Sequence, residues 1–222
     1  MTMSVSEAVA SRRSIRAYTD APVSLETITR VLDKARMAPS GCNFQPWDAT
    51  VLTGAPLKAL QDRLIASAPD DPLEYDFSAP QQREKYKARF SALGAAMYGA
   101  MAIGRDQKET RVDFVQQNLT SFGAPVLLLV HMPKLMLAPQ WADTGMWMQT
   151  VMLLLREEGL DSCPQEWMGV YGRTIKAHLG LDMDDVTLFC GLAIGTRDPD
   201  AAVNNFERER VPLAENISFL GF

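Results

Sequence analysis

Two continuous apolar runs place the tightest limits on the fold of this chain. Residues 125–132 read PVLLLVHM and residues 185–194 read DVTLFCGLAI, and both are short and rich in branched side chains, which is typical of strands buried on both faces. Between them, residues 139–158 are apolar nearly all round, which predicts a central helix that ends at Gly159. Because the helices come in runs rather than in regular βαβ alternation, we expect an α+β fold, with a modest mixed sheet wrapped by helices.

Weaker patterns complete the expected secondary structure. Residues 48–53 are strand-like, and the segment from Pro69 to Pro80 is rich in Asp, Pro and aromatic residues, which favours an irregular surface loop. Further helices are expected over residues 5–13, from the N-cap Ser24 to before Pro39, and over residues 56–67, 81–103, 106–119 and 171–179. No repeat or low-complexity linker divides the 222 residues, so we expect a single domain over residues 1–222.

The composition argues against several classes of protein. With 22 Lys and Arg against 27 Asp and Glu, the chain carries a formal charge of -5, which disfavours binding to nucleic acid or to an anionic membrane. The three cysteines form no CxxC pair and the two histidines no HExxH motif, so neither a disulfide framework nor a metal site is expected. The most apolar helical stretch, Met146–Leu155, is too short to span a bilayer, and the first residues lack the order of a secretory signal. We therefore expect a cytoplasmic protein.

The N-terminal segment SRRSIR concentrates positive charge. The polar side chains of interest are Arg12, Arg13, Ser14 and Arg16. Neighbouring guanidiniums repel one another unless an anion lies close, and their planar forks suit a phosphate, to which the serine hydroxyl can also donate. The alternative interpretation is a solvated helix end with surface arginines.

A second basic pair lies near the C-terminus. Arg208 and Arg210 share one face of an extended chain, so both can reach the same anion. The alternative is a salt-bridged tail, because three glutamates are close in sequence. The chain then ends in the apolar stretch ISFLGF, which is typical of a segment that docks on something else, such as a partner subunit.

Two further segments offer polar groups to a ligand. The first, APSGCNFQPW, carries a hydroxyl and two amides in a loop made rigid by proline and glycine; the residues are Pro39, Ser40, Asn43 and Gln45. Groups that both donate and accept match the edge of a heteroaromatic ring better than a metal, although they also suit an ordered turn. The second, GLDSCPQEW, contains Pro164, which we expect to leave the following backbone amides, of Gln165 and Glu166, free to face a ligand.

Taken together and in this order, these segments closely resemble the FMN-dependent nitroreductase family, in particular its nitrobenzoate-reductase-like branch. The resemblance covers nearly the whole chain, through SRRSIRAY, APSGCNFQPW, APVLLLV, GLDSCPQEW and NNFERERVPLAENISFLGF. It implies an α+β homodimer with two FMN sites at the subunit interface and a C-terminal extension that lies on the partner.

The resemblance also implies a role for each polar segment. The flavin phosphate and ribityl chain would be held by Arg12, Arg13, Ser14 and Arg16, with a C-terminal basic pair nearby, Arg208 and Arg210. The same flavin would be reached from the other subunit by Pro39, Ser40, Asn43 and Gln45. Backbone amides would face flavin N5 and O4 in the segment of Pro164, Gln165 and Glu166. One departure is Trp167, which stands where many relatives have Gly.

The activity implied by the resemblance is a ping-pong reaction. NADPH or NADH reduces the flavin and leaves, and a nitroaromatic, quinone or similar electron-poor acceptor then reoxidises it, with no side chain as catalytic acid or base. The pocket lid is expected from one of two sets of aromatic residues, either Tyr75, Phe77 and Tyr86 or Phe114 and Phe122, and for the last two the alternative is packing in the core. The alternatives are another flavin reaction on the same fold (dehalogenation or oxidase-type chemistry) and a flavin-binding regulatory protein without turnover.

Overall fold

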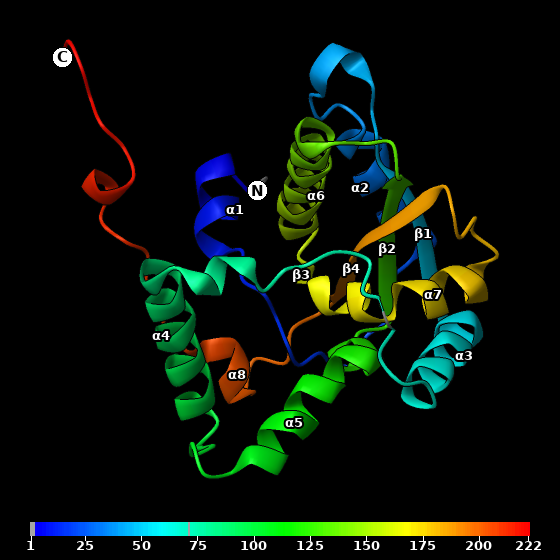
Figure 1. Ribbon diagram of the computed structural model, residues 1–222, viewed down its shortest axis with the longest axis horizontal. Helices are drawn as coiled ribbons and strands as arrows, with labels where there is room; N and C mark the ends of the chain where they lie inside the picture. Colours follow the sequence, from blue (N-terminus) through cyan, green and yellow to red (C-terminus); the bar gives the residue numbers. More distant parts are fainter. Residues whose placement is uncertain (1–2, 71) are drawn as a thin grey trace.

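A four-stranded antiparallel sheet forms the centre of the molecule (Figure 1). The computed structural model describes residues 3–70 and 72–222. The strands lie in the order β1-β2-β4-β3, and their bounds are Asp48–Thr53 for β1, Val126–Pro133 for β2, Asp161–Gln165 for β3 and Val186–Gly195 for β4. The two apolar runs thus form the two central strands, as predicted.

The prediction of a mixed sheet is corrected by the strand directions. All three strand pairings are antiparallel, and the one parallel pairing among the described residues is an isolated bridge between Ser14 and Ser162. Continuous apolar runs indicate strands that are buried on both faces but do not fix the strand direction. Here the same burial arises because helices cover both faces of an antiparallel sheet.

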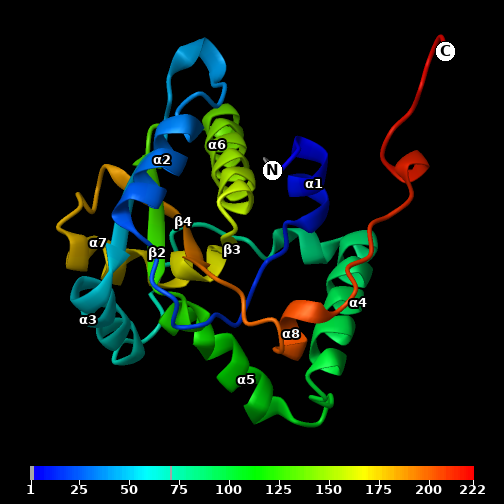
Figure 2. The same cartoon turned by 180° about the vertical axis from the view of Figure 1, so that it is seen from behind.

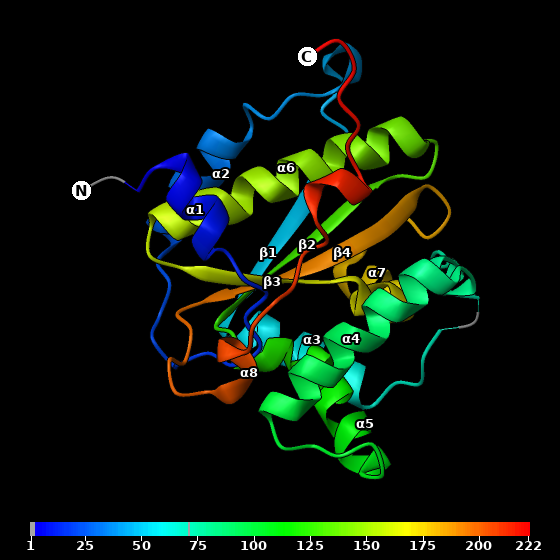
Figure 3. The same cartoon turned by 90° about the vertical axis from the view of Figure 1, so that its left-hand side faces the viewer.

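The alternation of side chains along β2 shows how the two faces are covered. Val126, Leu128 and Val130 pack against α2 and α6, whereas Leu127 and Leu129 pack against α3, α7 and the 3-10 segment Glu166–Tyr171. Figure 3 shows the sheet between these two layers. The bounds of the helices are Val5–Ser11 (α1), Leu25–Ala35 (α2), Gly54–Ile65 (α3), Glu84–Ala100 (α4), Lys108–Gln116 (α5), Ala138–Glu157 (α6), Gly172–Leu179 (α7) and Ala202–Asn205 (α8).

Two parts of the chain project from this core. Helix α4 has no buried residue, and Figure 2 shows the C-terminal tail passing beside it and away from the sheet. Large apolar side chains of the tail are exposed: Leu213, Ile217, Phe219, Leu220 and Phe222. No helix among the described residues is long and apolar enough to cross a membrane.

Two local expectations differ from the structure. Strand β3 was not predicted, and Pro164 lies inside it, paired in register with Leu192, so the proline does not interrupt the ladder. The strand tolerates Pro164 because β3 is an edge strand, where a missing N–H need not face a neighbour. The first helix ends at Ser11 rather than at residue 13, so Arg12 is extended, with φ -62 and ψ 128.

Candidate functional site

The N-terminal arginines are positioned by an extended segment that runs beside β3. Helix α1 begins with a capping box between Ser4 and Glu7 and ends at Ser11. After it, Ile15 is fully buried and its N–H donates to the Ser162 carbonyl at 3.1 Å. Because side chains alternate along an extended chain, the burial of Ile15 turns its neighbours toward the opposite side.

The C-terminal segment returns to the same place. The Arg208 guanidinium donates to the Arg12 carbonyl at 3.0 Å, and the Arg13 guanidinium donates to the Phe206 carbonyl. Asn204, which is buried, accepts from the Arg16 N–H at 2.9 Å. The structure therefore brings together two segments that the sequence separates by almost its whole length. We call Arg12, Arg13, Arg16, Arg208 and Arg210 the arginine cluster.

The arginine cluster has an excess of positive charge. Within residues 3–70 and 72–222, no carboxylate forms an ion pair with any of its five guanidiniums, whose described partners are carbonyl oxygens. Burial, together with the charges of Arg13, Arg12, Arg210 and Arg197, lowers the pKa of Arg208 to about 10. Burial and the charge of Arg210 also lower the pKa of Arg12. Guanidiniums remain charged at neutral pH, so these shifts report a positive potential that an anion would relieve.

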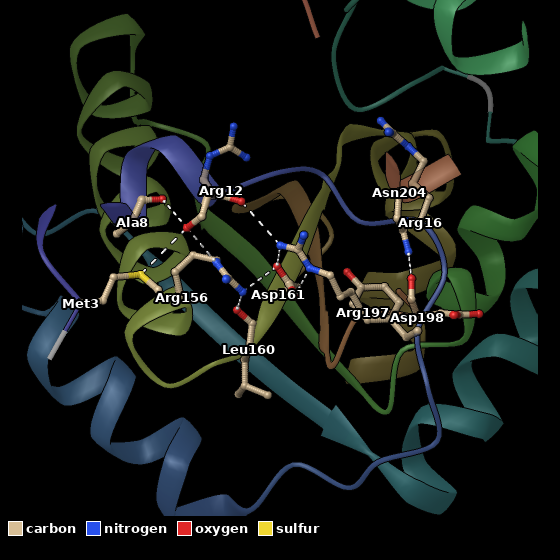
Figure 4. A network of polar contacts seen from close by, with 12 residues as sticks. Met3, Ala8, Arg12, Arg16, Arg156, Leu160, Asp161, Arg197, Asp198 and Asn204 are labelled. Atoms are coloured by element: carbon tan, nitrogen blue, oxygen red, sulfur yellow. Dashed lines mark hydrogen bonds and ion pairs between the residues drawn. The ribbon is translucent and has the colours of Figure 1, made fainter. Parts of the chain in front are cut away.

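A buried carboxylate lies behind the cluster. Asp161, which is 2% exposed, accepts two hydrogen bonds from Arg197, at 2.7 and 2.5 Å, and one from Arg156 at 2.9 Å. Figure 4 shows both arginines reaching Asp161, while the side chain of Arg12 points away from it. This single carboxylate pairs with Arg156 and Arg197, which leaves that group with one net positive charge, and within the described residues it pairs with none of the cluster arginines.

The β3 segment offers polar atoms that the chain itself does not satisfy. The buried Gln165 amide donates to the carbonyl and side-chain oxygens of Asn118, at 3.0 and 3.1 Å, while its own oxygen has no partner among the described residues. The buried Ser162 hydroxyl is also unpaired within the described residues. Pro164 is half-buried and Glu166 is exposed just beyond the strand. Since buried polar groups are normally paired, these atoms fit a polar ligand lying along β3.

The loop of residues 38–47 lies elsewhere and is built to be rigid. Cys42, Asn43 and Gln45 adopt left-handed φ values of 51°, 58° and 48°. The Ser40 hydroxyl accepts from the Gln45 N–H at 2.9 Å, and the Gly41 N–H donates to Asp143 at 3.1 Å. The loop thus holds a conformation that non-glycine residues adopt only at some cost, which is typical of functional segments.

Helix α6 separates this loop from the arginine cluster. Asp143 anchors the loop, whereas Arg156, near the other end of the helix, donates to the Ser11 hydroxyl at 3.3 Å. Arg156 comes thirteen positions after Asp143 in α6, which corresponds to a rise of about 20 Å. Within one chain, Pro39, Asn43 and Gln45 are exposed and are not brought to the arginine cluster.

The five lid candidates differ in their environments. Phe114 and Phe122 are 8% and 7% exposed and pack in the core, which is the alternative stated for them above. Tyr75 and Phe77 are half-buried in a group of aromatic rings that includes Trp141, Phe189 and Trp167. Tyr86, on α4, is 46% exposed.

Sequence reasoning missed four residues of this region: Asn118, Asp161, Arg197 and Asn204. Asn204 bonds to Arg16 across 188 positions, and Arg197 to Asp161 across 36. Asp161 was part of a segment singled out for its backbone amides, but nothing local marked its carboxylate as buried. Such partners become visible only when the tertiary structure is known.

An α+β fold that holds uncompensated guanidiniums beside unsatisfied groups of a sheet edge defines a binding protein for a phosphate-bearing ligand. The chain matches the model of the nitroreductase family over residues 9–196. It therefore belongs to the nitroreductase family.

Individual relatives agree with this assignment. The chain is 35% identical to the 4-nitrobenzoate reductase of Pseudomonas putida over 216 residues, covering 96% of this chain and 94% of the relative. It is 31% identical to nitroreductase NfnB of Mycolicibacterium smegmatis, covering 95% and 90% of the two chains. The crystal structure of the FMN and NADPH-dependent nitroreductase NfnB from Sphigopyxis sp. strain HMH is similar with a TM-score of 0.93 and 46% identity, covering 99% of this chain and all of that one.

Proposed function

We propose that the protein is an FMN-dependent oxidoreductase that uses NADPH or NADH to reduce nitroaromatic compounds, quinones or similar electron-poor acceptors in a ping-pong cycle. The observation that carries this proposal is the arginine cluster, whose half-buried guanidiniums lack a counter-charge in the described chain. The names of the relatives support the substrate class, since one is named 4-nitrobenzoate reductase and another nitroreductase NfnB.

The flavin would lie along β3 with its phosphate at the arginine cluster. The phosphate and ribityl chain would be bound by Arg12, Arg13, Ser14, Arg16, Arg208 and Arg210. Burial and then the charges of the neighbouring arginines lower the pKa of Arg208, and a phosphate with about two negative charges would offset both by pairing with the guanidinium. The ring would be contacted by Pro164, Gln165 and Glu166, where the unpaired Gln165 oxygen offers an acceptor.

The chain's own residues bind and orient rather than act as acid or base. FMN, when bound, supplies the capacity to accept a hydride from NAD(P)H and to pass electrons to the second substrate. The arginines hold its charged end, and the β3 segment fixes the position of its ring. Tyr75 and Phe77, which pack against Trp141 and Trp167, would form part of the wall that keeps water from the ring.

The site would be completed by a second copy of the chain. In such a homodimer, Pro39, Ser40, Asn43 and Gln45 of one subunit would reach the flavin of the other, which accounts for a rigid polar loop with no ligand of its own. The exposed apolar residues of the tail, such as Phe219 and Leu220, would cover the partner. We further propose a single domain over residues 1–222 that acts on small molecules in the cytoplasm, without nucleic-acid partners.

A visible absorbance spectrum of the purified protein tests the proposal. A flavin band that bleaches under nitrogen when NADPH or NADH is added, and returns when 4-nitrobenzoate is added, is the expected result. A protein that stays colourless after incubation with FMN would contradict it. A flavin that is never reduced would favour the regulatory alternative, and turnover of halogenated but not nitrated phenols would favour dehalogenation.

A further inference from the structure

The carboxylate of Asp161 lies beside an excess of positive charge and contacts only part of it. Among seven arginines in this region, its described partners are Arg156 and Arg197. The remaining five form the arginine cluster, for which the described chain provides no carboxylate partner. The seven guanidiniums therefore fall into two groups. Arg156 and Arg197 pair with Asp161, whereas the arginine cluster has no carboxylate partner within the described residues.

Arg156 and Arg197 also contact Ser11, the last residue of α1. Arg156 donates through Nε to the Ser11 hydroxyl at 3.3 Å, and Arg197 donates through Nη2 to the Ser11 carbonyl at 3.5 Å. Both guanidiniums are oriented by their bonds to Asp161, at 2.9 Å from Arg156 and 2.7 Å from Arg197. The side chains of Arg156 and Arg197 thus connect the Asp161 carboxylate to Ser11 and hold Ser11 in position.

The residue after Ser11 is the first member of the arginine cluster. The Arg12 carbonyl accepts from Arg208 at 3.0 Å, so the position of this backbone also sets the position of the Arg208 guanidinium. A continuous set of contacts thus runs from Asp161 through Arg156 and Arg197 to Ser11, then to Arg12 and Arg208. In Figure 4 the Arg12 side chain extends away from the Asp161 carboxylate.

We propose that Asp161 is a positioning residue for the phosphate end of the flavin, holding Arg12 and Arg208 in place through Arg156, Arg197 and Ser11. The proposal rests on the proposed FMN-binding function and adds a residue that does not touch the cofactor. It also assigns Arg156 and Arg197 a structural task that separates them from the arginines that bind the phosphate.

Electrostatics and positioning predict opposite effects when this carboxylate is removed. Asp161→Asn deletes one negative charge near the bound phosphate, and by Coulomb attraction alone FMN would bind more tightly. If Asp161 instead orients the guanidiniums, the variant loosens Arg12 and Arg208, and FMN binds more weakly. The sign of the change therefore distinguishes the two roles.

The experiment measures the dissociation constants of FMN and of riboflavin, which lacks the phosphate, for flavin-free protein by flavin fluorescence. For Asp161→Asn we expect FMN affinity to fall by about ten-fold and riboflavin affinity to stay within a factor of about two. The matched control is Asp198→Asn, which removes a charge one residue from Arg197; the Asp198 carboxylate accepts from the Asp200 N–H at 2.9 Å and leaves Ser11 untouched. We expect this control to bind FMN as the unmodified protein does.

Each other outcome has a defined meaning. Tighter FMN binding by Asp161→Asn, or equal weakening of FMN and riboflavin, would overturn the positioning role. If the variant does not unfold cooperatively, Ser11→Ala combined with Arg197→Lys decides, because together they remove the hydroxyl that Arg156 contacts and the guanidinium that holds the Ser11 carbonyl while keeping the positive charge; selective weakening of FMN supports the proposal and unchanged binding overturns it. Unmodified protein that binds neither flavin would instead reject the proposed function itself.

Discussion

The arginine cluster and the loop of residues 38–47 lie toward opposite ends of α6 and are built in opposite ways. The cluster collects residues from both ends of the chain and is held by long-range bonds, such as that between Arg208 and the Arg12 carbonyl. The loop is held mainly by its own short-range bonds, with one anchor at Asp143. The cluster is half-buried, whereas the loop exposes most of its polar groups. The first is proposed to bind the flavin phosphate, and the second is a rigid group of donors and acceptors proposed to reach the flavin of a partner subunit.

Replacing Arg208 by Ala has the largest expected effect and tests the cluster half of this contrast. Arg208 is half-buried and bonded to Arg12, so its loss should weaken FMN binding about ten- to hundred-fold. The matched control is Arg210→Ala, whose guanidinium is exposed and should matter several-fold less. Both are measured by FMN titration of flavin-free protein. Equal losses of FMN affinity in the two variants would show that the greater burial of Arg208 does not make it more important than Arg210 for FMN binding.

Mixed dimers test whether the two regions complete each other across an interface. Asn43→Ala and Arg12→Ala should each reduce the flavin content of their own homodimers. Co-expressed with different affinity tags, the two variants should form a mixed dimer with one intact site and one doubly altered site. The flavin content of that dimer should recover to about half of the unmodified level. Recovery no greater than in either parent would place both residues in one subunit's site.

Replacing Asp143 tests whether the loop of residues 38–47 must be anchored to bind FMN, without changing the polar side chains of the loop itself. Asp143→Ala leaves the Gly41 N–H without its acceptor and should lower the free energy of unfolding by about 1–3 kcal/mol, measured by urea denaturation of flavin-free protein. Asp143→Asn keeps an acceptor oxygen and should cost less. FMN affinity should follow the same order if the loop must be held in place to bind. Identical stability of both variants would remove Asp143 as the anchor.

Cys42→Gly has the smallest expected effect. Cys42 has a φ of 51°, a conformation that costs a residue with a Cβ about 1–2 kcal/mol in the folded state. Glycine removes this cost, but its greater conformational freedom in the unfolded state offsets about 0.5–1 kcal/mol of the gain in stability. We expect a net stabilisation of about 0.5 kcal/mol by thermal or chemical denaturation. Cys42→Ala keeps the Cβ and should give no gain. A destabilised glycine variant would show that the loop does not carry backbone strain at this position.

The local sequence pattern predicted strands β1, β2 and β4 but missed β3, whose polar residues are buried by contacts with distant parts of the chain. Strands β2 and β4 are apolar throughout, so their pattern identifies them directly. Strand β3 reads DSCPQ, and its polar residues are buried by partners far away in the chain, such as Arg197 and Asn118. Local composition carries no sign of that burial.

The same distinction holds for the candidate site. The arginines could be nominated because like charges close in sequence need an explanation that their neighbours do not give. Asp161 and Asn204 could not, because each is a common polar residue whose importance comes from contacts that the fold creates. The end of α1 at Ser11 was also missed by two residues, and that boundary decides where the Arg12 side chain points.

In the proposed homodimer, the length of α6 would make cofactor loading depend on protein concentration. Because the proposed halves of one flavin site are kept about 20 Å apart on each chain, two copies must associate before either site is complete. A ligand that binds only the associated pair shifts the monomer–dimer equilibrium toward that pair by mass action. Dilution should then release flavin and separate the subunits at the same time, and added FMN should restore the dimer. In this way the cofactor would also stabilise the association of the two subunits.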